Sequence, residues 1–274
     1  MTDEDRHRVR ARELAVLFAG RAAISHESAA LLHRLQLPPI NLVRVHATWP
    51  GSAGRRGTSN IHPHRGLLDE TDLVIVDGTL VTSVARTVFD IARTAMPSVA
   101  VAAADSALRS GAVSRAALRA LLDRSRRVTG HRKALHVIEF ADPRAESVGE
   151  SICRVRMAQL GIPTPTPQAV IGGVGLEFDP RVDFEIDGFG TVVEFDGRIK
   201  YGRLVPDGKS AGDVVFDEKR REDAIRATGR ECVRIVWDEL RLDRYPALLP
   251  RFASAFGRAG HPTWQPGHRQ FLTR

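Results

Sequence analysis

The amino-acid sequence predicts an α/β protein made of two domains and a short C-terminal tail. Apolar residues recur at helical spacing over several long segments. Strand-like runs lie between these segments, and one of them contains the turn pair Asp77-Gly78. After Asp142-Pro143 the expected order is helix, three strands, helix and strand, which is typical of helices layered against a sheet. We therefore expect domains at residues 1–142 and 143–258 and a tail at residues 259–274.

The first domain is expected to begin with helix and to continue into a small antiparallel sheet. The stretch from Asp5 to about Leu37 has helical periodicity, with Ser25 as a candidate N-cap inside it. The pair Pro38-Pro39 ends this stretch. Residues 41–81 then change to a strand-like pattern.

Residues 85–140 return to a helical pattern in four pieces. The breaks fall near Pro97, Gly111 and Gly130. Ser114 is a suitable N-cap for the third piece because its hydroxyl can accept a hydrogen bond from a free amide of the first turn.

The second domain alternates helix and strand. The expected elements are a helix from Glu146 to Leu160, a strand around Ala169, a hairpin from Arg181 to Tyr201, a helix from about Asp213 to Thr228, the strand ECVRIVW and a helix near Leu248 to Phe256. Trp264 falls in the tail, which we expect to be loose.

Composition limits the class of protein. The 274 residues are 43% hydrophobic and 27% charged, with no apolar run long enough for a membrane span and no apolar segment of signal-peptide type behind the charged N-terminus. We therefore expect a cytoplasmic protein with no membrane partner. The two cysteines, Cys153 and Cys232, are expected to be reduced core residues rather than a disulfide or a metal site.

The net charge of +7 favours a polyanionic partner. Arginines are clustered in RSRRVTGHRK (residues 124–133) and EKRRED (residues 218–223). Arginine contacts to phosphate release counterions and so add affinity for nucleic acid. The alternative is that these runs are solvated helix faces.

The hairpin RVDFEIDGFGTVVEFDG gathers carboxylates on one face. If Gly188-Phe189 is a two-residue turn, Asp183 lies directly opposite Glu194, and Arg181 lies opposite Asp196. Opposed carboxylates about 5 Å apart repel each other unless a cation lies between them. On this basis, removing one charge by Glu194→Gln should slightly raise the stability of the metal-free protein.

Oxygen ligands alone suit Mg²⁺ or Mn²⁺, which bind a few carboxylates together with substrate phosphates. The candidate metal ligands are Asp183, Glu194, Asp196 and Glu150. The alternative is a solvent-facing hairpin whose charges are screened by water and by Arg181.

Glu150 lies on the helix that precedes the sheet. It shares a face with Cys153 and Met157, at the margin of the apolar stripe, so its carboxylate can point toward the sheet. The alternative is a surface ion pair between Glu150 and Arg154.

The order of Glu150, Asp183 and Glu194, followed by KRREDAIRATG and CVRIVW, resembles the PD-(D/E)xK nuclease superfamily, most closely its very-short-patch-repair-like endonuclease domains. The resemblance covers about residues 144–240. It implies a restriction-endonuclease-like mixed sheet flanked by helices, with the acids holding Mg²⁺ for phosphodiester hydrolysis. Where the superfamily has a lysine two residues after the second acid, this chain has Asp196. Lys200 and Lys219 are the candidates for a relocated catalytic lysine, and each could instead be a solvated surface charge.

The first domain is also similar to a known group. SHESAALLHRL and VDGTLVTSVARTVFDIAR resemble the region that follows the winged helix in actinobacterial abortive-infection type IV antitoxins. The chain opens directly in the helix that would follow that winged helix. The resemblance implies a possible toxin partner protein.

Several histidines lie in this region. His46, His62 and His64 are a weak zinc pattern without a cysteine, so we expect surface or phosphate-contacting side chains. Ser25 and His26 have no evident acid partner for a hydrolase triad.

Together these features predict a metal-dependent endonuclease that acts on DNA in preference to RNA, with Asp183 and Glu194 as its central residues. The alternative functions are a non-catalytic nucleic-acid-binding regulator or antitoxin that retains the nuclease scaffold, and a protein-interaction module paired with a toxin.

Overall fold

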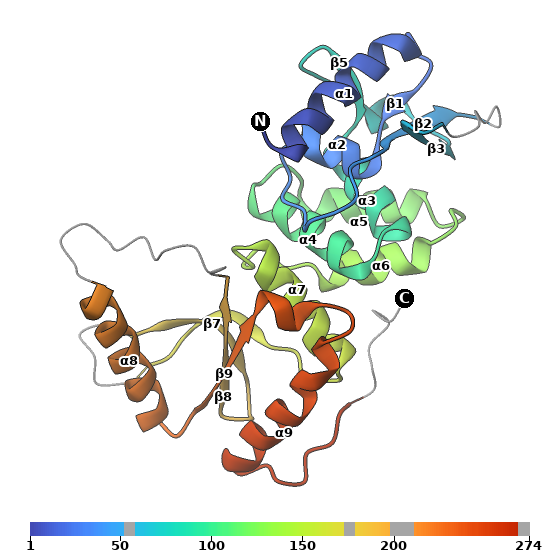
Figure 1. Ribbon diagram of the computed structural model, residues 1–274. Helices are drawn as coiled ribbons and strands as arrows, with labels where there is room; N and C mark the ends of the chain where they lie inside the picture. Colours follow the sequence, from blue (N-terminus) through green and yellow to red (C-terminus); the bar gives the residue numbers. More distant parts are fainter. Residues whose placement is uncertain (52–57, 173–178, 198–210, 268–274) are drawn as a thin grey trace. The chain divides into compact units, whose positions relative to one another are not determined.

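Two α/β units, each with its own mixed sheet, make up the chain (Figure 1). The computed structural model describes residues 1–51, 58–172, 179–197 and 211–267, and of residues 211–218 it describes the backbone alone. The first unit ends at Val148 and the second begins at Gly149. The sequence had placed this division at Asp142.

The sheet of the first unit has five strands in the order β3-β2-β1-β5-β4. They are β1 (Ala23–Ile24), β2 (Val45–Pro50), β3 (Ile61–Gly66), β4 (Leu73–Val76) and β5 (Thr79–Thr82). The pairs β2/β3 and β1/β5 are parallel, whereas β1/β2 and β4/β5 are antiparallel. The prediction of a small antiparallel sheet is therefore wrong. The central strand β1 has only two residues, too few to interrupt the helical pattern of the surrounding sequence.

The turn between β4 and β5 is as predicted. Val76 pairs with Thr79, which leaves Asp77 and Gly78 as a two-residue loop. Their φ angles are 46° and 74°, the left-handed values that a type I′ hairpin turn requires at both positions.

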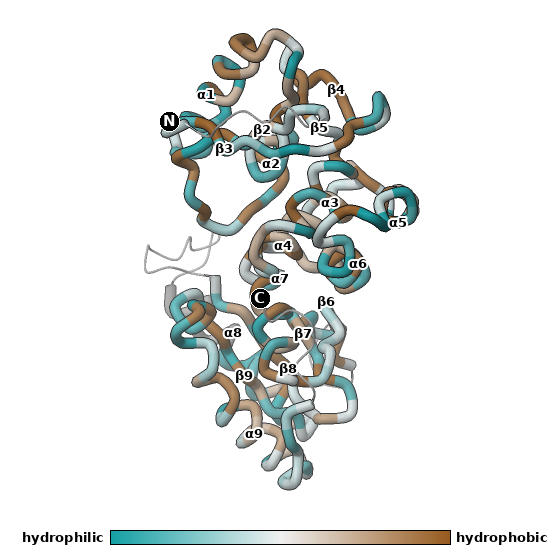
Figure 2. The backbone as a smooth tube through the Cα atoms, turned by 90° about the vertical axis from the view of Figure 1, so that its right-hand side faces the viewer, coloured by the Kyte–Doolittle hydropathy of each residue, from teal (hydrophilic) through white to brown (hydrophobic). Residues whose placement is uncertain are grey.

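In the described part of the first unit, α-helices accompany this sheet. They are α1 (Asp3–Phe18), α2 (His26–Leu32), α3 (Val84–Thr94), α4 (Pro97–Arg109), α5 (Arg115–Arg124) and α6 (His131–Phe140). The four predicted pieces between residues 85 and 140 are confirmed, and Ser114 Oγ accepts a hydrogen bond from the Ala117 amide at 3.1 Å. Hydrophobic and hydrophilic residues alternate along α5 (Figure 2). The helix buries Leu118, Leu121 and Leu122.

A buried charge network anchors α3 beside β4. The Arg86 side chain donates to Asp90 at 2.9 Å and to Asp72 at 2.8 Å, and also to the carbonyl of Leu67 at 2.7 Å. Arg86, Asp72 and Asp90 are 6%, 2% and 0% exposed. Because these charges are almost fully removed from water, each depends on its partners for compensation.

The sheet of the second unit has four strands in the order β6-β7-β8-β9. The elements of this unit are α7 (Val148–Gln159), β6 (Thr166–Val170), β7 (Arg181–Ile186), β8 (Thr191–Asp196), α8 (Ala211–Ala227), β9 (Glu231–Val236) and α9 (Leu248–Arg258). The first three strands are antiparallel and β9 runs parallel to β8. Helices α8 and α9 flank the strands on opposite sides (Figure 1). The predicted order of helix, three strands, helix and strand is confirmed.

The register of the acidic hairpin agrees with the sequence-based alignment. Phe184 pairs with Val193 and Ile186 pairs with Thr191. The paired ladder ends at Phe184–Val193, and the same register continued by one step sets Asp183 opposite Glu194. The turn has four residues rather than two, running from Asp187 to Gly190. Its centre is still Gly188-Phe189, so the longer turn leaves the register unchanged.

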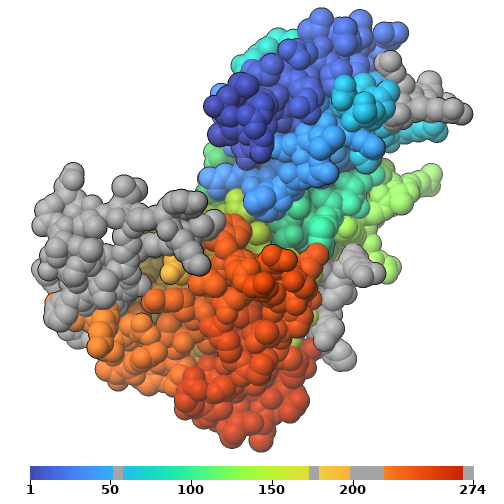
Figure 3. All heavy atoms as spheres, in the orientation of Figure 1, coloured from blue at the N-terminus to red at the C-terminus, as the bar shows by residue number. Residues whose placement is uncertain are grey.

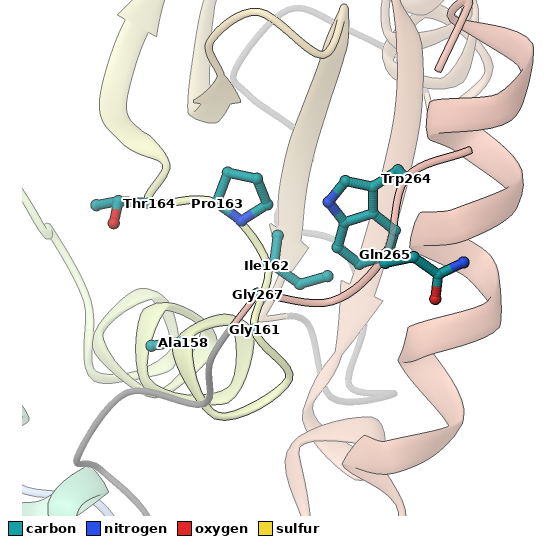
Figure 4. Close-up of a pocket in the computed structure, with 8 residues that line it drawn as sticks. All are labelled: Ala158, Gly161, Ile162, Pro163, Thr164, Trp264, Gln265 and Gly267. Atoms are coloured by element: carbon teal, nitrogen blue, oxygen red, sulfur yellow. The ribbon is translucent and has the colours of Figure 1, made fainter. Parts of the chain in front are cut away.

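The segment after α9 packs against its own unit. Trp264 meets Phe256 edge-on with ring centroids 4.8 Å apart, and the Gly267 amide donates to the Gly161 carbonyl at 3.0 Å. Figure 4 shows Trp264 facing Ile162 across a cavity of about 360 Å³. The expectation of a loose Trp264 is therefore wrong. The last part of the described chain, coloured orange to red, forms much of the visible face of this unit (Figure 3).

Within the described ranges, no helix has the length and apolar character needed to cross a membrane. Cys153 and Cys232 are both free thiols, as predicted.

Candidate active site

The predicted carboxylates meet at a small cavity in the second unit. Its volume is about 180 Å³. The cavity is lined by residues of β7, β8, β9 and α8 and by the residue that follows β8. They are Asp183, Glu194, Phe195, Asp196, Gly197, Arg221 and Arg234. Three carboxylates and two guanidinium groups thus share one depression of the surface.

Asp183 is partly buried in the wall of this cavity. Its Oδ2 accepts a hydrogen bond from the Phe195 amide at 2.7 Å. Burial raises the pKa of Asp183 to about 6, and the negative charges of Glu150 and Glu194 act in the same direction, while the Phe195 amide and Arg221 oppose the shift. Ionisation of Asp183 is therefore less favourable in the metal-free protein than it is in an exposed aspartate.

Glu194 is balanced by arginine. Its carboxylate lies 2.8 Å from Arg221 and 3.6 Å from Arg234. Arg221 also donates to the Arg181 carbonyl at 2.6 Å, and Arg234 lies 3.6 Å from Glu222. The sequence predicted a bound cation, or screening by water and Arg181, beside the opposed carboxylates, whereas α8 and β9 supply Arg221 and Arg234.

Glu150 is buried, as its inward-facing interpretation predicted. It is 6% exposed and accepts a hydrogen bond from Gln168 Nε2 at 2.8 Å. The alternative of a surface pair with Arg154 is wrong, because Arg154 is itself only 4% exposed. The influence of Glu150 on the pKa of Asp183 places its charge near the cavity.

Gln168 is a site residue that the sequence reasoning missed. It lies opposite Asp183, between the strand pairs Pro167–Phe184 and Ala169–Val182. Its φ of 55° is in the left-handed region, so it breaks the ladder where it turns toward Glu150. A glutamine among proline and threonine residues gave no pattern from which this contact could be inferred.

The two lysine candidates have different outcomes. Lys219 is exposed on α8 and is not among the described residues that line the cavity. Lys200 lies outside the described residues. The described cationic groups of the cavity are Arg221 and Arg234. Arg221 lies in the arginine cluster of residues 218–223, which the sequence associated with phosphate contacts but not with this cavity.

A histidine group in the first unit departs from the expectation of surface side chains. His26, His46 and His64 each offer one potential ligand atom, and the three atoms lie within 4.8 Å of one another. His26 is fully buried and stacks on His64. From the sequence, His26 was considered only with Ser25 as part of a hydrolase triad, and the zinc pattern consisted of His46, His62 and His64.

Comparisons with known proteins give relatives but no named activity. No family model matches the sequence, and no solved structure matches it. Two curated relatives are the uncharacterized proteins Rv2248 of Mycobacterium tuberculosis strain ATCC 25618 / H37Rv and MT2308 of strain CDC 1551 / Oshkosh. Each is 30% identical over 235 residues, which cover 81% of this chain and 83% of the relative. The chain belongs to the same protein family as these two mycobacterial proteins.

Proposed function

We propose that the second unit is a metal-dependent nuclease that hydrolyses phosphodiester bonds, in DNA more readily than in RNA. The observation that carries the proposal is the pairing of β7 with β8. It sets Asp183 opposite Glu194 at the cavity that Asp196 also lines. The resemblance of residues 144–240 to very-short-patch-repair-like endonucleases supports the same assignment.

The electrostatics of the cavity fit a bound divalent cation. A carboxylate whose pKa is raised by burial and by neighbouring carboxylates is stabilised in its ionised form when a cation binds beside it. Asp183, Glu194 and Asp196 would hold Mg²⁺ or Mn²⁺ through oxygen atoms, and Glu150 with Gln168 would position the site. When bound, the ion lowers the pKa of a coordinated water and stabilises charge on the phosphate.

Arg221 and Arg234 have a place in this reaction. Their side chains are 36% and 37% exposed, so phosphate oxygens can reach them from solvent. When Glu194 binds a cation, its pairing with both arginines weakens and the guanidinium groups become available to a phosphate. A guanidinium binds phosphate through two parallel hydrogen bonds, which would orient the scissile group.

A second candidate function is a non-catalytic nucleic-acid-binding regulator, with or without a toxin partner. The observation that favours it is the pairing of Glu194 with Arg221 and Arg234, which balances this carboxylate without a metal.

Cleavage of supercoiled plasmid and of single-stranded DNA tests the proposal. We expect nicking or degradation with Mg²⁺ or Mn²⁺ and none with EDTA. Asp183→Asn and Glu194→Gln should each slow cleavage by about 100-fold or more, because each removes a charge that holds the ion.

Glu185→Gln is the matched control. Glu185 lies on β7 as Asp183 does, but it pairs with Arg230 at 3.0 Å and is not among the described cavity residues. We expect its cleavage rate to match that of the wild type. Wild-type protein that binds DNA but does not cleave it with either metal would contradict the nuclease proposal and support the regulator.

A further inference from the structure

We infer that the first unit contains a transition-metal site, suited to Zn²⁺, formed by His26, His46 and His64 with Glu27 beside them. One ligand atom from each histidine lies within 4.8 Å of the others. This site is separate from the carboxylate cavity of the proposed function, and it uses nitrogen ligands, which suit Zn²⁺ rather than Mg²⁺.

The fold brings these residues together from three elements. His26 begins α2 immediately after β1, His46 lies on β2 and His64 lies on β3. The sheet order β3-β2-β1 makes these strands neighbours, and the parallel register sets Thr48 opposite His64, two residues from His46. His26 has a φ of 51°, a left-handed conformation that is uncommon outside glycine and is often found at functional sites.

The polar atoms of this group crowd around one point. His64 Nε2 lies 3.0 Å from His46 Nδ1, and Glu27 Oε2 lies 3.1 Å from the same nitrogen. One ring nitrogen can carry only one hydrogen, so His46 Nδ1 cannot donate fully to both neighbours. A cation placed among the three atoms would interact with all of them.

Two of the buried atoms have no hydrogen-bond partner in the described structure. They are Nε2 of His26, whose residue is 0% exposed, and Oε2 of Glu27, which lies near His46 without the alignment of a hydrogen bond. Buried polar atoms are nearly always paired in folded proteins. A bound ion would supply the missing partner for both.

The other nitrogen of His26 is already held. His26 Nδ1 lies 3.0 Å from Ser25 Oγ, which accepts a hydrogen bond from Thr48 Oγ1 at 2.8 Å. When Nε2 binds a metal, Nδ1 carries the hydrogen and donates a hydrogen bond to Ser25 Oγ. Metal-binding histidines usually make such a bond from their other ring nitrogen to a fixed acceptor. This role explains why Ser25 occupies the N-cap position of α2 but makes no side-chain cap hydrogen bond.

The histidines are neutral at physiological pH, which is the form that binds metal. Burial lowers the pKa of His46 to about 4 and that of His64 to about 3, and it lowers the pKa of His26 well below its ordinary value. The Glu27 carboxylate offers a negative charge beside His46. Arg86 and Arg93 are the nearby positive charges that act on His26.

Binding requires a small rearrangement of the rings. Nitrogen ligands of tetrahedral Zn²⁺ lie about 3.4 Å apart, which follows from Zn–N bonds of about 2.0–2.1 Å. The His26 and His64 rings are stacked at 3.5 Å and 14°, so they must turn for both lone pairs to point at one ion. His62 is exposed, stacks on the His46 and His64 rings and stands outside the ligand set.

Metal titration of the full chain tests the inference. Chelator-stripped protein should take up one equivalent of Zn²⁺ with a rise in melting temperature, and Co²⁺ should give the visible absorption of a tetrahedral site. His46→Ala and His64→Gln should abolish both effects. Ser25→Ala should weaken binding by about 10- to 100-fold while leaving the stoichiometry unchanged.

Two controls separate this site from its surroundings and from the carboxylate cavity. His62→Ala removes an adjacent exposed histidine and should bind Zn²⁺ as the wild type does, and Asp183→Asn should leave Zn²⁺ uptake at the histidines unchanged. Failure of DNA cleavage would therefore not affect this result. The inference would be overturned if the wild-type protein took up no Zn²⁺. It would also be overturned if the His46→Ala and His64→Gln variants were folded and still bound Zn²⁺. Because the wild-type stoichiometry needs no variant, the test stands even if a variant fails to fold.

Discussion

Asp183 and Glu194 face each other across β7 and β8, yet the fold treats their charges differently. Glu194 has two arginines within 3.6 Å, whereas the Asp183 carboxylate is partly desolvated and accepts one backbone hydrogen bond. In the metal-free protein the charge of Asp183 therefore lowers stability and the charge of Glu194 raises it, although the two residues look equivalent in the sequence.

The first prediction concerns the pH dependence of stability in EDTA. The pKa of Asp183 is about 6 in the folded state and 3.8 in a model peptide, so unfolding releases its proton between these values. Stability should fall as pH rises from about 4 to 6 and carry the full penalty above that range. Asp183→Asn removes this effect, so its melting temperature should exceed that of the wild type at pH 7 by a few degrees and approach it near pH 4.

Glu194→Gln provides the contrast. The sequence argument expected this change to relieve repulsion and raise stability, but the structure places Arg221 and Arg234 on the carboxylate. Removing it leaves both arginines without this partner, so the metal-free variant should be less stable by about 1 kcal/mol or less. A melting temperature above that of the wild type would mean that repulsion by Asp183 outweighs the arginine contacts.

Arg86 pairs with two buried carboxylates of the first unit. Arg86→Met would leave Asp72 and Asp90 buried beside fewer cations, and we expect a loss of about 3–5 kcal/mol in the free energy of unfolding. Urea unfolding measures this loss. Arg119→Met is the control, because the Arg119–Glu139 pair is exposed and should contribute about 1 kcal/mol or less. Equal losses in the two variants would contradict the importance of burial.

At the scale of elements, the contact between α7 and β8 controls the geometry of the carboxylate cavity. Gly149 approaches the Phe195 ring so closely that an added Cβ would overlap ring carbons. The amide of the same Phe195 holds Asp183. The absence of a side chain at Gly149 therefore lets α7 carry Glu150 close to the sheet.

Gly149→Ala should destabilise the protein by about 1–3 kcal/mol, because the methyl group must displace the Phe195 ring or shift the helix. Gly257 is the matched helical control. A Cβ there would meet only Pro262 at 3.9 Å, so Gly257→Ala should be neutral or stabilising by up to about 1 kcal/mol through helix propensity. Thermal unfolding of the two variants compares them directly, and similar behaviour would refute the steric argument.

At the scale of the whole molecule, the net charge of +7 predicts how the protein binds DNA. Log affinity falls linearly with log salt concentration, and each phosphate neutralised by arginine or lysine makes this fall steeper by about 0.9. We expect affinity for a short duplex to fall steeply between low and physiological salt. Arg221→Ala should reduce the slope by about one unit if Arg221 contacts a phosphate. A flat dependence would indicate a protein partner.

Much of the architecture follows from local pattern. Alternation and the Gly188-Phe189 centre predicted the hairpin register, because a strand must direct alternate residues to opposite faces whatever its neighbours are. Ser114 predicted the start of α5 for a similarly local reason, since a cap and the amide it accepts from lie within one turn.

The tertiary structure alone decided the features that join distant segments. One such feature is the central place of β1 in its sheet. Others are the grouping of His26 with His46 and His64, and the ion pairs that α8 and β9 make with Glu194. All of them depend on which elements pack together. Hydrophobic periodicity indicates which residues of one element face the core and which face solvent. It does not indicate which other element packs against that buried face. The sequence by itself therefore determined where the carboxylates of the hairpin would face, and only the folded chain determined which cations balance them and which histidines come together.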